Sequence, residues 1–339
     1  MKRRDKFPLE YGDGSAGTNE FLTNEILTRF KHPSLRELED SSHLSLGGIR
    51  FAITTDTFIV DPPEFPGGDI GRMAVCGTVN DLVAGGARPQ ALTLGLVVEE
   101  GYSMDALCRI LDSIASAVEQ AKVNIIAGDT KVLNKVNSIG VCINTSGIGE
   151  VIDPQRSFRL SDATSTSSII VTGTVGDHGL SVLSKREGLG FENVISSDCA
   201  PLNDLIIPLI TNFSGILSLR DPTRGGLREA LHSLATASAL DVLIETSNIP
   251  IKPEVNFGCE MLGLDPIDLV NEGKMLLVVE SNQESRILSA LREHPLGKDS
   301  MTIGHLHPTQ SSPSVLLIDN NGNKRHSMQL KGPPIPRLC

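Results

Sequence analysis

The sequence predicts an α/β (α+β) protein with two domains and an extended C-terminal tail. Segments patterned as strands alternate with segments patterned as helices in both halves of the 339-residue chain. A polar stretch at 153–167, rich in Ser and Thr, separates the halves. Three prolines in the last nine residues exclude a helix or a central strand there. We therefore expect α/β domains at 1–155 and 165–330, and a tail at 331–339.

The composition is that of a globular protein and argues against several classes of partner. Hydrophobic residues make up 40% of the chain, and the net charge is −11. The one basic block is Lys2-Arg3-Arg4, so we expect neither nucleic acid nor an anionic membrane as a partner. No apolar run is long enough to cross a bilayer, and the first ten residues do not resemble a signal peptide. These features favour a cytoplasmic location.

The first half is predicted to contain alternating strands and helices. In chain order they are a short amphipathic helix at 21–30, a strand at 49–54, a helix at 69–84, a strand at 90–98, a helix at 104–121, and strands at 123–127 and 138–150. Asp69 is placed to N-cap the second helix. Small residues recur along that helix at 71, 74 and 77, a spacing that permits close packing.

Carboxylates stand at the ends of three of these elements. Two strands are expected to end at Asp56 and Asp129, each beside a Thr, and the helix between them carries Asn80 and Asp81 near its end. Mg²⁺ prefers hard oxygen ligands such as carboxylates and phosphate. We therefore predict a metal site formed by Asp56, Asp81 and Asp129, with Asn80 as a further oxygen ligand of metal or phosphate. A solvated turn remains an open alternative for Asn80 and Asp81.

The second half repeats the alternation and adds two glycine-rich helix starts. We expect strands at 169–175, 241–245, 275–279, 301–305, 314–319 and 325–330, and helices after 179, at 204–212, from 225 to 239 and at 283–293. Asp177 and His178 lie between glycines at the first helix start, where backbone amides suit an anion. Arg224 precedes a glycine pair at another start, which also suits phosphate. A plain capping or turn role for His178 stays open.

The chain ends in a cysteine that the tail could carry across a domain. Nine extended residues span about 30 Å, and the last of them is Cys339. The six cysteines form no CxxC pair, so no zinc or dithiol motif is present. An ordinary disordered terminus is the alternative, and it is the more frequent state of terminal residues.

Taken together, these motifs resemble the HypE family of hydrogenase maturation proteins, within the PurM-like ATP-binding superfamily. The residues that carry the resemblance are Thr55-Asp56-Thr57, Asn80-Asp81-Leu82, Gly128-Asp129-Thr130-Lys131, Gly176-Asp177-His178-Gly179, Asp221-Pro222-Thr223-Arg224-Gly225-Gly226, Asn271-Glu272-Gly273-Lys274 and Pro336-Arg337-Leu338-Cys339. The resemblance covers essentially the whole chain. Leu338 stands where the family usually has Ile, and Tyr11 and Ser15-Ala16 depart from the family's N-terminal loop.

The resemblance implies an enzyme that uses ATP and Mg²⁺. A carbamoyltransferase, HypF, places a carbamoyl group on Cys339, and the protein dehydrates it to a thiocyanate. The cyano group then reaches the iron of [NiFe] hydrogenase through the HypC–HypD complex. By motif position, Glu272 and Lys131 serve as acid–base groups. Motif position likewise places Thr130, Asp177, His178 and Arg224 at the nucleotide, and the superfamily implies a homodimer formed through the N-terminal domains.

Two other functions remain open at this stage. One is a small-molecule phosphotransferase of the same superfamily, such as a selenophosphate synthetase or a thiamine-phosphate kinase, which has no use for a terminal cysteine. The other is a non-enzymatic scaffold whose tail docks on a partner. Only the dehydratase function predicts ATP-dependent chemistry that requires Cys339, so this requirement distinguishes it from both alternatives.

Overall fold

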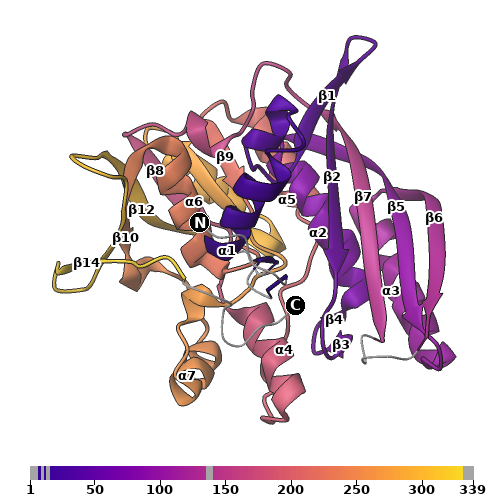
Figure 1. Cartoon of the computed structure of the whole chain (residues 1–339). Helices are drawn as coiled ribbons and strands as arrows, with labels where there is room; N and C mark the ends of the chain where they lie inside the picture. Colours follow the sequence, from indigo (N-terminus) through magenta and orange to yellow (C-terminus); the bar gives the residue numbers. More distant parts are fainter. Residues whose placement is uncertain (1–6, 9–10, 13–15, 135–139, 331–339) are drawn as a thin grey trace.

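Figure 1 shows the computed structural model of the chain, which describes residues 7–8, 11–12, 16–134 and 140–330. It has two α/β halves, each built on one mixed sheet, which confirms the predicted two-domain PurM-like fold class. The sheets occupy 42–151 and 167–326. The predicted domain limits are close to these ranges and stay predictions. None of the helices in the described ranges is both long and apolar enough to cross a membrane.

The N-terminal sheet has five strands in the order β1-β2-β7-β5-β6. These are β1 (Ser42–Leu46), β2 (Ile49–Phe58), β7 (Val141–Val151), β5 (Ala87–Glu99) and β6 (Asn124–Leu133). All neighbours are antiparallel except β5 and β6, which are parallel because α3 (Met104–Ala121) connects them. The two edges of the sheet are therefore β1 and β6.

The C-terminal sheet has seven strands in the order β14-β13-β10-β12-β8-β11-β9. In chain order the elements of this half are β8 (Ser167–Val171), α4 (Asp177–Glu187), α5 (Asn203–Asn212), β9 (Ile216–Arg220), α6 (Gly226–Ser238), β10 (Leu240–Glu245), α7 (Pro253–Leu262), β11 (Leu276–Glu280), α8 (Glu284–Arg292), β12 (Met301–Pro308), β13 (Val315–Ile318) and β14 (Lys324–His326). Alternate residues of β8 pack in different clusters, Ile170 with α5 and Ile169 with α6. The sheet thus has an apolar layer on each face.

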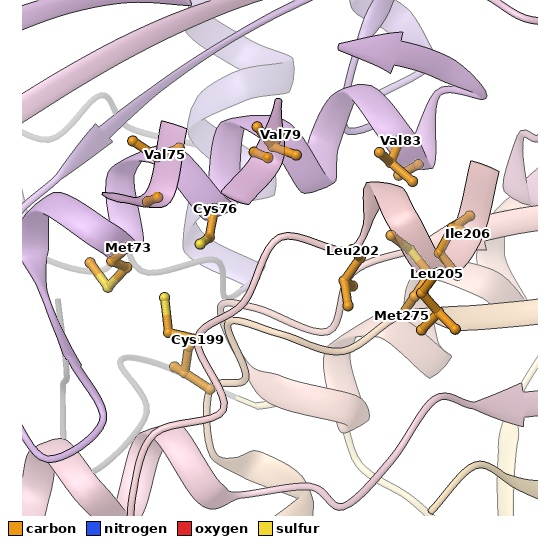
Figure 2. Packing of buried hydrophobic residues seen from close by; sticks show 14 of the residues in the cluster. Met73, Val75, Cys76, Val79, Val83, Cys199, Leu202, Leu205, Ile206 and Met275 are labelled. Carbon is orange, nitrogen blue, oxygen red and sulfur yellow. The ribbon is translucent and has the colours of Figure 1, made fainter. Parts of the chain in front are cut away.

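Helix α2 (Ile70–Ala84) joins the two halves through its packing. Nearly all of its residues are buried, as expected for a helix that is apolar on every side. Figure 2 shows its residues Cys76 and Val83 facing Cys199, Leu202 and the rest of one cluster from the second half. A side chain on Gly71 would collide with the carbonyl oxygen of Ile110 in α3, so this glycine allows the two helices to touch. Figure 1 shows α2 behind β2, beside the second domain.

The limits of several elements differ from the sequence predictions. Strands β2 and β6 do not end before Asp56 and Asp129 but run through them, because both residues pair in the sheet. The expected helix at 21–30 is instead a short helix, α1 (Ala16–Phe21), followed by a π-helical turn at 22–26. Strands β1 and β9 and helix α7 were missed. The predicted limits of α3 match the structure, and those of α2 differ by one residue.

Candidate active site

A cavity of about 990 Å³ lies where the first sheet meets the second domain. Its walls come from the segment before β1, from β1 and β2, from α2, and from the loop between β9 and α6. The polar and charged side chains that line it include Glu39, Asp40, Thr54, Thr55, Asp56, Thr57, Asp81, Arg220, Asp221, Thr223, Arg224, Glu229 and Glu272. This concentration of carboxylates beside arginines and a helix start makes the cavity the candidate active site.

Three carboxylates from different elements meet in this cavity. Oxygens of Asp40, Asp81 and Asp221 all lie within 4.8 Å of one another. Asp40 precedes β1, Asp81 lies near the end of α2, and Asp221 directly follows β9. Thr54 donates its hydroxyl hydrogen to Asp81 at 2.8 Å, and Asp56 from the same strand is close enough to raise the pKa of Asp81 beyond the effect of burial. The fold therefore brings together carboxylate oxygens from separate sequence segments, and no single sequence motif contains all of them.

The electrostatics of the cluster favour a bound cation. Burial raises the pKa of Asp81 well above its ordinary value, and the charges of Asp56 and Asp221 raise it further. The pKa of Asp221 is also raised well above normal, first by burial and then by Asp40. Arg220 contacts Asp40 at 3.1 Å and offsets part of this repulsion. Several carboxylates at such distances are held apart by their charge unless a cation or protons neutralise them.

The start of α6 adds a site for anions on the same cavity. Arg224, Thr223 and Gly226 line the wall, and the N-cap Gly225 provides no side chain to occupy the first amides of the helix. Gly226 has a positive φ of +62°, and a Cβ there would lie 2.5 Å from the carbonyl oxygen of Leu269. The Gly226 amide itself donates to the Thr223 carbonyl at 2.8 Å, so the attraction for an anion comes from the positive end of the α6 dipole and from the Arg224 guanidinium, which together suit phosphate oxygens.

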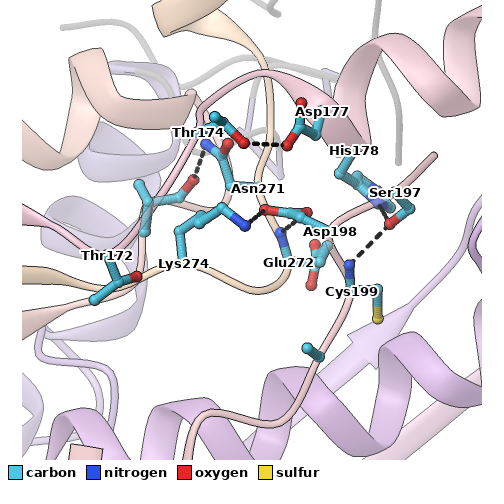
Figure 3. A network of polar contacts seen from close by, with 12 residues as sticks. Thr172, Thr174, Asp177, His178, Ser197, Asp198, Cys199, Asn271, Glu272 and Lys274 are labelled. Atoms are coloured by element: carbon cyan, nitrogen blue, oxygen red, sulfur yellow. Dashed lines mark hydrogen bonds and ion pairs between the residues drawn. The ribbon is translucent and has the colours of Figure 1, made fainter. Parts of the chain in front are cut away.

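Glu272 lines the cavity, and residues of both domains form hydrogen bonds with its backbone. Asn80 of α2 donates its amide hydrogen to the Glu272 carbonyl at 3.3 Å, and the Glu272 amide donates to Asp198 at 3.0 Å (Figure 3). Burial raises its pKa well above the ordinary value, followed by the effects of Asp221 and Asp198. The ionised form of a carboxyl with a raised pKa is a stronger base than an ordinary carboxylate. Gly273 lies against the Asp198 backbone with no room for a side chain.

The structure does not bring Asp129, Thr130 and Lys131 to this cavity. They lie on β6, and the sheet register places Asp129 three strand spacings from Asp56, about 14 Å away. Asp129 is exposed and ion-paired with Lys131. The predicted cluster of Asp56, Asp81 and Asp129 is therefore wrong within one chain, because β7 and β5 separate β6 from β2.

Asn80 and the Asp177–His178 pair are also placed away from the cavity. The Asn80 side chain is buried and hydrogen-bonds the backbone of Ala200, Leu202 and Glu272, so it joins domains. Asp177 pairs with Lys252 at 3.0 Å. His178 contacts Ser197 at 2.9 Å, and burial lowers its pKa to about 4 (Figure 3). Each of the three side chains thus contacts protein groups and none lines the cavity, although Oδ1 of Asp177 is buried without a hydrogen-bond partner.

The remaining site predictions have mixed outcomes. Asp56, Asp81, Arg224 and Glu272 line the cavity, whereas Cys339 lies outside the described residues. Sequence reasoning missed Asp40 and Asp221 as members of the carboxylate cluster. Asp221 stood inside a recognised motif, whereas Asp40 precedes a strand that was not predicted, so no pattern distinguished it from a surface acid.

Two family models together match most of the chain. The AIR synthase related protein N-terminal domain matches residues 38–151, and the AIR synthase related protein C-terminal domain matches residues 167–314. The fold and the cavity thus define a two-domain protein of the AIR synthase related, PurM-like class. A thiamine monophosphate kinase of Aquifex aeolicus, 18% identical with a TM-score of 0.65, shares this fold.

Closer relatives specify the family. The carbamoyl dehydratase HypE of Escherichia coli is 37% identical and covers 98% of both chains. A putative hydrogenase expression/formation protein of Methanocaldococcus jannaschii is 40% identical over 98% of this chain and 100% of its own. A chain of the crystallised HypE–HypF complex superposes with a TM-score of 0.86 at 38% identity, covering 91% of this chain and 99% of that one. HypE crystallised with ATP gives 0.82 at 37% identity, covering 98% and 100%. The chain belongs to the HypE family of carbamoyl dehydratases.

Proposed function

We propose that this protein uses ATP to dehydrate an S-carbamoyl group on its own Cys339 to a thiocyanate, which supplies the cyano ligand of [NiFe] hydrogenase iron. The observation that carries the proposal is the single cavity in which a carboxylate cluster, an arginine-flanked helix start and Glu272 meet. Membership of the HypE family supports the choice of reaction. The HypE crystallised with ATP supports the choice of nucleotide.

The residues of the cavity fit a divalent cation bound to a polyphosphate. Asp40, Asp81 and Asp221 offer hard oxygens within 4.8 Å of one another, which suits Mg²⁺, and Asp56 lies beside them. Such a cation neutralises phosphate charge during phosphoryl transfer. Arg224 and the N-terminal end of α6 are placed to hold the phosphate that is transferred.

The reaction requires phosphoryl transfer and the loss of two protons. The carbonyl oxygen of the thiocarbamate attacks the γ-phosphorus of ATP, ADP leaves, and the nitrogen loses its first proton to give a C=N–H group. The C–O bond then breaks, inorganic phosphate leaves with its electron pair, and the nitrogen loses the second proton as the C≡N bond forms. We assign Glu272 as the proton acceptor, because it lines the cavity and its raised pKa favours proton uptake.

The polar residues of β6 lie away from the cavity of their own chain, but in a homodimer they can act at the cavity of the other protomer. Strands β1 and β6 are the two edges of one sheet, and β1 residues line the cavity. If β6 of a second copy lies along β1, then Asp129, Thr130 and Lys131 approach the cavity of the other protomer. A two-fold axis makes both contacts at once and leaves neither edge exposed. We therefore place Lys131 as an acid–base group acting across the dimer.

The proposal includes two protein partners and a location. Because a relative forms the HypE–HypF complex, we infer that a carbamoyltransferase of the HypF type loads Cys339. The thiocyanate carbon then passes to an iron carrier of the HypC–HypD type. We place these steps in the cytoplasm, where ATP is the available phosphoryl donor.

ATP consumption by the loaded chain tests the proposal. A chain carbamoylated by a HypF-type enzyme should release one ADP and one phosphate per Cys339, whereas unloaded chain and Cys339→Ala should release neither. A thiamine-phosphate kinase activity would instead phosphorylate its small substrate with Cys339→Ala as fast as with wild type. That result, or ADP release independent of loading, would contradict the proposal.

A further inference from the structure

The last described residues of the chain lie along α6 and are held there by side chains. Ser327 accepts a hydrogen bond from Arg228 at 2.7 Å, and its own amide donates to Val315 at 2.8 Å. Arg228 is itself fixed by an ion pair with Asp265 at 2.9 Å. The segment after β14 therefore follows the surface of α6 and does not leave the domain where the sheet ends.

Glu229 holds the end of this segment with both of its carboxylate oxygens. Oε1 accepts the backbone amide of Leu330 at 2.9 Å, and Oε2 accepts the side-chain amide of Gln329 at 2.9 Å. The residue is only 5% exposed, and burial raises its pKa while these two bonds oppose the rise. A buried carboxylate needs such donors, because leaving it without partners is unfavourable for folding. The bonds are therefore structural requirements of this position.

The same residue lines the active-site cavity. Glu229 stands three residues after the first residue of α6, about 4.5 Å along the helix axis from the end that carries Gly226 and faces the phosphate site. Leu330 is thus fixed within one helical turn of the cavity wall. The nine residues that follow it in the sequence end at Cys339.

We propose that Glu229 is a positioning residue that fixes the start of the tail at the cavity, so that nine residues deliver the loaded Cys339 to ATP. The inference rests on the proposed function and specifies how its substrate reaches the site. Without this anchor, the free segment would begin after Ser327 and contain 12 residues. A longer tether that starts farther from its target lowers the effective concentration of the tethered group.

The test compares loading with dehydration in Glu229→Ala, Glu229→Gln and wild type. Glu229→Gln keeps both bonds, since its oxygen accepts from Leu330 and its amide donates to a rotated Gln329. We expect Glu229→Ala to be carbamoylated at the wild-type rate, because the tip of the tail is unchanged. At saturating ATP it should dehydrate its own Cys339 at least about twofold more slowly. Glu229→Gln should restore most of the rate, and Glu260→Ala, an exposed change on α7, should leave both steps unaffected.

Hydrogen exchange of the C-terminal peptide tests the anchor independently of chemistry. The Leu330 amide should be protected in wild type and Glu229→Gln, and should exchange faster in Glu229→Ala. Faster exchange with an unchanged dehydration rate would overturn the inference and leave the proposed function intact. Equal exchange in all three proteins would overturn the anchor itself. If loaded wild type does not dehydrate at all, the proposed function fails, whatever the exchange shows.

Discussion

At the residue scale, the site depends on carboxylates that raise one another's pKa. Asp81 and Asp221 lie beside Asp40 and Asp56 in a poorly solvated cluster, and the four come from different segments of the chain. Such a cluster costs folding free energy that only a bound cation or protons recover. Lower folding stability in a group of residues that binds a ligand is typical of functional sites.

Asp81→Asn should separate stability from function. Removing one carboxylate relieves the repulsion, so we expect the metal-free protein to gain about 1 kcal/mol or to stay unchanged. Mg·ATP should raise the unfolding temperature of wild type and not that of the variant, and ADP release from loaded chain should stop. Thermal unfolding with and without Mg·ATP measures the first effect. A variant that is still stabilised by Mg·ATP would contradict the assigned cluster.

We expect His178 to make the free energy of unfolding depend on pH and to have no role in binding the nucleotide. Burial lowers its pKa from 6.5 to about 4, so the unfolded chain binds more protons than the folded one between these values. The contribution of neutral, buried His178 to the free energy of unfolding is therefore fully present above about pH 6.5. It decreases by up to about 3 kcal/mol as the pH falls towards 4.

The variant His178→Gln tests this assignment. Its unfolding free energy should vary less between pH 6.5 and pH 4.5 than that of wild type, measured by denaturant titration at each pH. ATP affinity at pH 7.5 should match wild type. A large loss of affinity in a folded variant would instead return His178 to the nucleotide site.

At the element scale, β6 is an edge strand with the features of an interface. Ile126 is 69% exposed and Val132 70% exposed, which is unusual for apolar residues in a sheet. Asp129 and Lys131 lie on the same strand and away from the cavity of their own chain. The proposed pairing with a second copy would bury the apolar residues and bring the polar ones to the partner's cavity.

Val132→Asp should therefore dissociate the dimer and remove activity together. A charge at this position is costly only if the strand is buried by a partner. Sedimentation should show a monomer that is folded but does not dehydrate loaded Cys339. Val194→Asp, at a similarly exposed valine in the second domain, is the matched control and should remain dimeric. A dimeric, active Val132→Asp would refute this interface.

Elements with strong local signals could be predicted from the sequence, and contacts between elements could not. Helix α2 begins one residue after its predicted N-cap, because Asp69 accepts the amides of Gly71 and Arg72 as expected. The two strand-end aspartates looked equivalent in sequence. They differ because β7 and β5 lie between their strands, and strand order is a long-range property. Asp40 was missed because the strand that it precedes, β1, has no clear local signal.

At the scale of the whole molecule, the site exists because α2 holds the two domains together. Asn80 connects α2 to the backbone of Ala200, Leu202 and Glu272, while its neighbour Asp81 faces the cavity. One turn of helix thus fixes both Asp81, the proposed metal ligand, and the backbone of Glu272, the proposed proton acceptor. If these roles hold, the relative position of the domains is coupled to the geometry of catalysis.

Asn80→Ala should damage stability and catalysis in the same protein. Three buried backbone groups lose their partner, which we expect to cost about 2–4 kcal/mol. Dehydration should slow more than ATP binding weakens, because Glu272 loses one of its two backbone contacts while the Asp81 cluster remains. Denaturant unfolding and single-turnover kinetics measure the two effects. Unchanged kinetics in a destabilised protein would restrict Asn80 to a structural role.

The central claim is that Cys339 carries the substrate and that ATP converts it in place. Intact-mass and peptide mass spectrometry after incubation with a HypF-type carbamoyltransferase, carbamoyl phosphate and ATP tests this claim most directly. We predict that the C-terminal peptide gains one carbamoyl group, and that Mg·ATP then removes the mass of one water from that same peptide. A carbamoyl group that persists with Mg·ATP, or no gain on Cys339, would contradict the account.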